Sequence, residues 1–268
     1  MRTLGLVLIA AGVLFAGDAE PTQAQIDAII QKFAAHEAEF AKAREAYTYR
    51  QTARIQELDD AGNTTGRWEI VSDIVFNADG KRSEHVVRSP VPSLHELVLT
   101  PEDLEDLKSV QPFVLTTDQL SKYLIRYLGR QKVDEVGCYV FAVKPVKYEG
   151  KLRYFQGEVW VDDRDLQIVK SYGRGVGSAN KGGNGQQFPK FETYREQIDG
   201  KFWFPTYTIA NDTLHFKDMD VRMKQTVKYE DYKRFKADTT ITFGESVDEK
   251  KDEKKDEKKD PKPPVKKP

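Results

Sequence analysis

Few residues in this chain are arranged as catalytic or metal-binding residues usually are. The four histidines, His36, His85, His95 and His215, are far apart and show no His-x-His or His-Glu-x-x-His spacing, so they indicate no preformed zinc or iron site. Cys138 is the only cysteine, which excludes an intramolecular disulfide and a multi-cysteine metal site. We therefore expect no metal and no other cofactor.

Nucleotide binding and acyl transfer also lack their usual motifs. The Gly-Lys pairs at 80–81, 150–151 and 200–201 stand in short polar turns, and none belongs to a phosphate-binding loop. No serine lies in a Gly-x-Ser-x-Gly elbow. The 42 basic and 43 acidic side chains nearly cancel, which leaves no overall field to hold nucleic acid. We predict a binding protein rather than an enzyme, and no nucleic-acid partner.

The acidic cluster Asp162-Asp163-Arg164-Asp165 is the best candidate for paired carboxylates or a calcium site. It lies between two segments of strand character, at 157–161 and 166–170. Aspartate is common in turns between strands, and the alternating oxygen ligands of a twelve-residue calcium loop are missing. We interpret the cluster as a solvent-facing hairpin turn.

Apolar residues with a period of two predict the sheet that must carry any site. The even positions of 67–77, apart from Ser72, hold large apolar side chains: Trp68, Ile70, Ile74 and Phe76. Such alternation buries one face of a strand. Further strands are predicted at 47–57, 82–88, 138–146, 152–161, 166–173, 202–210, 220–230 and 237–243. Polar turns at 59–66, 77–81, 148–151, 198–201 and 211–213 separate strands of this kind, which indicates a large antiparallel sheet.

Helical periodicity predicts three helices beside the sheet. After Thr22, apolar residues recur every seven positions, at Ile26, Phe33, Phe40 and Tyr47, which predicts one amphipathic helix of about 24 residues at most. Because Glu37 and Arg44 interrupt the heptads, this helix should pack on a sheet rather than in a coiled coil.

The other two helices are predicted from their first residues. Thr100-Pro101-Glu102-Asp103 begins a short helix with a cap and an early proline. Thr117-Asp118 begins the third helix, which ends at Gly129 and carries Leu120, Leu124 and Tyr127 on one face. The glycine-rich stretch 173–187 is expected to have no secondary structure.

The two ends of the sequence differ from the part between them. Residues 1–19 combine a basic start with a short apolar run and are predicted to be a signal peptide. Cleavage is expected between Ala19 and Ala24, with an uncleaved anchor as the alternative. No cysteine is available there for lipid attachment, so we expect a periplasmic protein that is not a lipoprotein. Residues 245–268 hold 9 lysines and 8 acids and are predicted to be a disordered tail, with an envelope tether as the alternative.

Several segments of the central region, 20–244, resemble a known family. The segments 137–145, 157–162, 166–170 and 194–207 resemble strands of outer-membrane lipoprotein-sorting proteins, the LolA/LolB superfamily, and of their RseB-like relatives. The resemblance implies an α+β fold in which a large curved antiparallel sheet, a half-open β-barrel, packs on an N-terminal helix and short lid helices. It also implies an apolar interior that holds acyl chains.

The predicted ligand site is the apolar concave face of this sheet. Its partner would be a lipid or the acyl chain of a lipoprotein. The alternative partner is another envelope protein, which the chain would bind through the same sheet as a regulator or scaffold. From periodicity alone, the same side chains could equally form a filled core. The residues predicted to line the site are Trp68, Ile70, Ile74, Phe76, Leu120, Leu124, Tyr127, Val221, Met223, Val227 and Tyr229.

Overall fold

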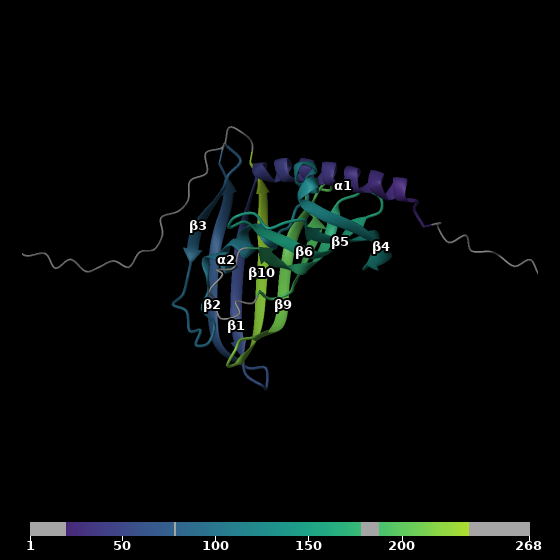
Figure 1. Ribbon diagram of the computed structural model, residues 1–268. Helices are drawn as coiled ribbons and strands as arrows, with labels where there is room; N and C mark the ends of the chain where they lie inside the picture. The colour runs from purple at the N-terminus through teal and green to yellow at the C-terminus, as the bar shows by residue number, and fades with distance from the viewer. Residues whose placement is uncertain (1–19, 78, 178–187, 236–268) are drawn as a thin grey trace, which may run out of the picture. The chain divides into compact units, whose positions relative to one another are not determined.

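Ten antiparallel strands form one curved, unclosed sheet in the computed structural model, which describes residues 20–77, 79–177 and 188–235 (Figure 1). Their spatial order is β3-β2-β1-β10-β9-β8-β7-β6-β5-β4. The strands are β1 (Tyr47–Leu58), β2 (Thr64–Phe76), β3 (Arg82–Arg88), β4 (Tyr123–Val133), β5 (Val136–Pro145), β6 (Arg153–Asp162), β7 (Ile168–Gly177), β8 (Phe191–Gln197), β9 (Trp203–His215) and β10 (Asp220–Arg234). The predicted fold class is confirmed.

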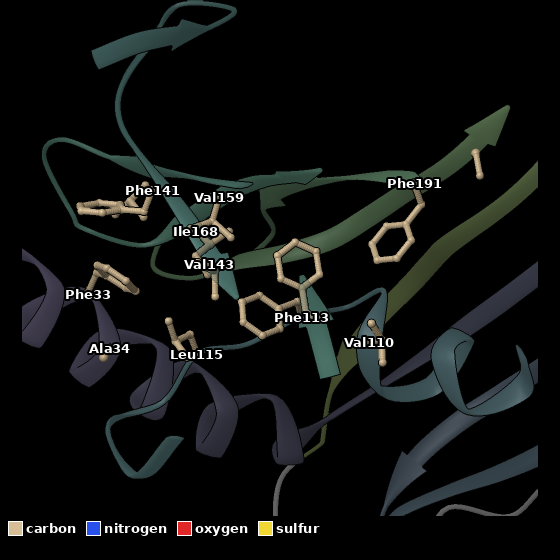
Figure 2. Packing of buried hydrophobic residues seen from close by; sticks show 13 residues of the cluster. Phe33, Ala34, Val110, Phe113, Leu115, Phe141, Val143, Val159, Ile168 and Phe191 are labelled. Carbon is tan, nitrogen blue, oxygen red and sulfur yellow. The ribbon is translucent and has the colours of Figure 1, made fainter. Parts of the chain in front are cut away.

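The helix α1 (Gln23–Ala43) begins where its sequence predicts and covers β4, β5 and β6 (Figure 1). Thr22 caps it, and the Gln25 side chain completes a capping box. Phe33 and Ala34 are completely buried. Figure 2 shows their side chains beside Leu115, Phe141 and Val143, in the layer between helix and sheet. The apolar face of α1 therefore packs on the sheet, as its broken heptads predict.

A second cover lies on the same face of the sheet, which we call the inner face. It consists of α2 (Pro101–Glu105), the π-helical turn η2 (Asp106–Val110) and an extended stretch that ends in the 3₁₀ turn η3 (Thr117–Lys122). Thr100 caps α2, with a proline at its start, so this predicted helix is confirmed. The ring of Phe113 stacks on Phe155 of β6 at 4.4 Å.

The predicted third helix is wrong. Residues 117–122 form only the short turn η3, and 123–133 form the edge strand β4, which pairs with β5. Tyr123, Ile125 and Tyr127 face the core, whereas Leu124 points to the other side and is 57% exposed. Leu120, Leu124 and Tyr127 thus share no helical face, because pairing with β5 imposes a period of two.

Smaller predictions also need correction. Residues 211–213 belong to β9, and the turn before β10 lies at 216–219, where Phe216 N–H donates to Met219 C=O. The alternation of apolar residues does not predict the strand β8. The strand β7 extends to Gly177 and so enters the glycine-rich stretch that is predicted to have no secondary structure.

Some sequence predictions lie wholly or partly outside the described residues. These are the signal peptide, the strand at 237–243, the charged tail and the glycine-rich stretch after 177. Between residues 20 and 235, as far as they are described, no helix is both long enough and apolar enough to cross a membrane.

Candidate functional site

Among the described residues, a hollow of the inner face lies on each side of the segment 101–112. Glu105, Lys108, Ser109 and Pro112 line one hollow, while Asp103, Asp106 and Gln111 line the other. Between them, Leu107 is buried in a cluster with Ala53, Val227 and Tyr229. This short helical segment therefore divides the open part of the inner face into two separate sites.

The first hollow, which we call the apolar cavity, has a volume of about 530 Å³. Ile55, Leu214 and Met223 form a small cluster at its base on β1, β9 and β10. Its other apolar walls come from Leu97, Val98, Leu99, Phe188, Pro189, Phe191 and Phe216. The volume falls in the range of about 300–1,000 Å³ that is typical of small-molecule sites.

A buried carboxylate holds one wall of the apolar cavity in place. Glu57 is 1% exposed, and its carboxylate accepts hydrogen bonds from the backbone N–H groups of His95, Glu96 and Leu97 at 2.7–3.1 Å. A Cβ at Gly66 would overlap this carboxylate, so glycine is required opposite it. The loop that carries Leu97 is thereby fixed to the end of β1.

Two polar atoms at the apolar cavity lack partners. The side chains of Gln111 and Gln225 both line the cavity. Gln111 Oε1, an acceptor, and Gln225 Nε2, a donor, are buried without a hydrogen bond among the described residues. Such atoms are costly unless something satisfies them. A ligand with an apolar body and one polar group would match this lining.

The second hollow, which we call the aromatic cleft, has a volume of about 720 Å³. Its aromatic walls are Phe40, Tyr47, Tyr49, Phe76, Phe204, Tyr229 and Tyr232. Arg44, Arg82, Glu84, Glu105 and Lys108 add charges. It is thus chemically distinct from the apolar cavity.

Under α1 the inner face is filled. Phe33, Phe113 and Leu115 lie in one cluster with Phe141 and have little or no exposed area (Figure 2). Phe155, which stacks on Phe113, belongs to the same cluster. For this half of the sheet, the alternative of a filled core holds.

A buried ion pair ties α1 to the sheet. Arg195 Nη1 on β8 donates to both carboxylate oxygens of Glu37 at 3.1 Å, and Ile168 N–H donates to Glu37 Oε1 at 3.1 Å. Arg195 Nη2 also donates to the Phe113 carbonyl. Burial raises the pKa of Glu37, while Arg195 and the Ile168 N–H act in the opposite direction. The pair and its backbone partners join four separate parts of the chain: α1, β7, β8 and the stretch that holds Phe113.

A second buried ion pair holds the dividing segment. Arg153 donates from Nε to Asp106 Oδ1 at 2.8 Å and from Nη2 to Oδ2 at 2.6 Å. Burial raises the pKa of Asp106, and Arg153 opposes this shift. A Cβ at Gly175 would overlap the Asp106 carboxylate, so the backbone of β7 needs glycine here. Part of the glycine-rich stretch is therefore a packing surface.

The structure distributes the predicted site residues over several places. Met223 lines the apolar cavity, and Phe76 and Tyr229 line the aromatic cleft. The remaining predicted residues line neither hollow. Trp68, Ile70 and Val227 belong to the cluster around Leu107. Leu120 and Tyr127 belong to the cluster under α1. Ile74 and Val221 are buried in other places, and Leu124 is exposed.

Several residues that shape the two hollows or hold their cover in place are not predicted by the sequence. Leu97 and Leu99 stand in a segment without periodicity, and Glu57 ends a strand in which it is one charged residue among several. Arg195 and Arg153 gave no signal, because their carboxylate partners lie 158 and 47 positions away. A charged residue inside an apolar heptad, as at Glu37, was the one available hint.

The acidic turn has the predicted position, but it does not face solvent throughout, because Asp162 is 6% exposed. Asp162 N–H donates to Gln167 C=O and Leu166 N–H to Asp162 C=O, which closes the hairpin between β6 and β7. Within the described residues, no group of three or more histidine, cysteine, aspartate or glutamate side chains could hold a metal ion.

No family model and no curated protein sequence matches the chain. Among solved structures it is similar to a LolA superfamily protein from Nitrosomonas europaea, with 15% identity, 75% of this chain and 94% of that chain covered, and a TM-score of 0.33. It is also similar to a putative outer membrane lipoprotein-sorting protein domain from Vibrio parahaemolyticus, with 12% identity, 79% and 95% covered, and a TM-score of 0.36.

A third similar structure is the MucA/MucB complex of Pseudomonas aeruginosa. It has 14% identity and a TM-score of 0.21, and the match covers 72% of this chain and 93% of that chain. The three structures include a protein of the superfamily that the sequence resembles. At these identities and TM-scores the chemistry of the site has to come from its own side chains.

Proposed function

We propose that this chain is an exported periplasmic binding protein that holds the acyl chain of a lipid or lipoprotein in the apolar cavity. The observation that supports this proposal is the cavity itself, which is lined by Ile55, Leu97, Leu99, Leu214 and Met223. No ionic group is needed to hold an alkyl chain, and each buried methylene contributes about 0.8 kcal/mol. Several methylenes in the cavity would therefore offset the cost of association.

The unpartnered amide atoms suit the polar end of an acyl group. Gln225 Nε2 is a donor without an acceptor among the described residues, and an ester or amide carbonyl is an acceptor. A bond between them would remove the penalty of a buried, unsatisfied N–H. This favours an acylated ligand over a plain hydrocarbon.

Replacing Leu97 by asparagine tests this function. Leu97→Asn places a polar amide in the wall of the cavity at a residue that is only partly buried, so the fold should persist. We expect binding of cis-parinaric acid, followed by its fluorescence, to weaken about tenfold or more, since a leucine contact is worth about 1.5–3 kcal/mol.

Leu124→Asn is the matched control. It makes the same substitution at an exposed leucine on the outer side of β4, and its affinity for cis-parinaric acid should equal that of the unchanged protein. If the unchanged protein does not bind the fatty acid at saturating concentration, or if both variants bind it equally well, the carrier function is wrong.

A second candidate function is binding of another envelope protein, which the sheet edges favour. Among the described strands, β3 and β4 form the two edges. Val86 and Val87 of β3 are 44% and 49% exposed, and a free edge can accept a further strand from a partner. Native mass spectrometry of the protein isolated from the cell envelope distinguishes the two functions, because it reports either a bound lipid or a bound protein.

A further inference from the structure

Arg44 is a cation without a counter-ion in the aromatic cleft. It follows α1 directly, and its guanidinium lies 5.9 Å from the ring centre of Phe40 and 5.7 Å from that of Phe76. No hydrogen bond or ion pair joins this guanidinium to any other described residue. Its contacts are therefore with aromatic rings and with the open space of the cleft.

Two of the carboxylates near Arg44, those of Glu37 and Glu84, are engaged by other cations. Both oxygens of Glu37 accept from Arg195. Glu84 accepts from Arg82 at 3.1 Å and from the Ser72 hydroxyl at 2.7 Å, and it lies 3.9 Å from Lys108 Nζ. Neither carboxylate forms an ion pair with Arg44, although the charge of Glu37 attracts it from a distance.

The cleft as a whole carries an excess of positive charge. Arg44, Arg82 and Lys108 line it, against the carboxylates of Glu84 and Glu105. Burial lowers the pKa of Arg44, and the charge of Arg195 acts in the same direction, whereas Tyr49, Glu37 and Tyr232 oppose this shift. Arg44 is partly buried, and a partly desolvated guanidinium without an ion-pair partner is unfavourable, so an anion entering the cleft would relieve this cost.

We propose that the aromatic cleft is a second binding site, which takes an organic anion with its charged group on Arg44 and its apolar body against the aromatic rings. A planar guanidinium can donate two parallel hydrogen bonds to a carboxylate, phosphate or sulfonate group. Tyr49 and Tyr232, stacked at 5.1 Å, and Phe204, 4.9 Å from Tyr232, offer ring surfaces for the body of the ligand. This site is independent of the proposed acyl cavity, which lies across the dividing segment.

Two fluorescent probes with the same aromatic body test the charge requirement. One is 8-anilinonaphthalene-1-sulfonate, and the other is N-phenyl-1-naphthylamine, which lacks the sulfonate. We expect the unchanged full-length protein to bind the sulfonate at least about tenfold more tightly than N-phenyl-1-naphthylamine, since a hydrogen bond to a charged group contributes this much affinity. Equal affinities for the two probes would overturn the proposal.

Arg44→Met should remove this preference by weakening sulfonate binding about tenfold or more while leaving the neutral probe unaffected. Arg44→Lys should restore part of it. Arg126→Met, the same change at an exposed arginine on β4, is the matched control and should behave as the unchanged protein. If Arg44→Met keeps the preference, the site is not at Arg44 and the proposal fails.

The thermal stability of the Arg44→Met variant is a second test of the role of Arg44. Arg44 is partly buried and forms no hydrogen bond or ion pair with another described residue, so replacing it by an apolar side chain of similar length removes a desolvated charge and should leave the thermal midpoint of Arg44→Met unchanged or higher. A fall of several degrees would assign Arg44 a structural role and overturn the proposal.

Displacement of the sulfonate probe identifies the source of the anion. Displacement by 3-phenylpropanoate indicates a free aromatic anion, and displacement by dodecanoate indicates the charged end of a lipid; either result supports the site. If neither displaces the probe, the proposal is wrong. Leu97→Asn should retain the preference for the sulfonate, so that failure of the acyl function and failure of this site can be told apart.

Discussion

Burial raises the pKa of Asp162 to about 6, and the neighbouring Asp165 carboxyl is a further cause. The side chain lies at the end of β6, and its Oδ1 also accepts from Arg164 N–H at 2.8 Å. A carboxyl whose pKa is raised by folding is most stabilising when protonated. Its contribution is therefore complete below the ordinary value of 3.8 and is lost as the pH rises through about 6.

Replacing Asp162 by asparagine should reverse this loss. Asp162→Asn removes the buried charge and keeps the acceptor for Arg164 N–H, so we expect a higher thermal midpoint than that of the unchanged protein at pH 7.5. The difference should shrink as the pH is lowered to 4, where the native carboxyl is protonated. Scanning calorimetry at several pH values measures this. Asp60→Asn, in an exposed turn, should show no such pH-dependent gain, and a gain for Asp162→Asn that is constant across pH would contradict the explanation.

At the scale of elements, α1 is attached to the sheet by apolar packing and by the Glu37–Arg195 pair. Glu37→Ala would leave the Arg195 guanidinium buried without its carboxylate and Ile168 N–H without an acceptor. We expect the free energy of unfolding in urea to fall by about 3–5 kcal/mol, the usual cost of breaking a buried pair from one side.

The double variant Glu37→Met/Arg195→Met provides the control for this prediction. Removing both charges leaves no unpaired ion, so most of the lost stability should return. If the double variant is as unstable as Glu37→Ala, or less stable, the loss comes from packing around the helix rather than from an uncompensated charge.

At the scale of the whole described domain, the segment 101–112 separates two hollows of different chemistry. A ligand at 100 times its Kd stabilises a protein by about 2.7 kcal/mol. If the hollows bind independently, dodecanol in the apolar cavity and 3-phenylpropanoate in the aromatic cleft should give additive stabilisation, about 5.4 kcal/mol together. Urea unfolding followed by tryptophan fluorescence measures this, and a gain no larger than that of one ligand alone would show a single shared site.

The sequence determined the local structure wherever a pattern of side chains is compatible with only one type of secondary structure. Alternation at Trp68, Ile70 and Ile74 gave β2, and the caps at Thr22 and Thr100 gave the starts of α1 and α2. In these places side-chain period or hydrogen bonding to nearby backbone decides the conformation. The acidic turn after β6 was predictable for the same reason.

Only the tertiary structure decided β4 and the two hollows. Leu120, Tyr123, Leu124 and Tyr127 fit a helical spacing, while Tyr123, Ile125 and Tyr127 fit a strand, and pairing with β5 selected the strand. Whether an apolar face is filled depends on what covers it: Phe33, Phe113 and Leu115 fill one half, and the segment 101–112 leaves the other half open on both sides. Partners such as Glu37 and Arg195 lie 158 positions apart, and contacts at that separation are set by packing of the whole sheet, which leaves no periodic trace in the sequence.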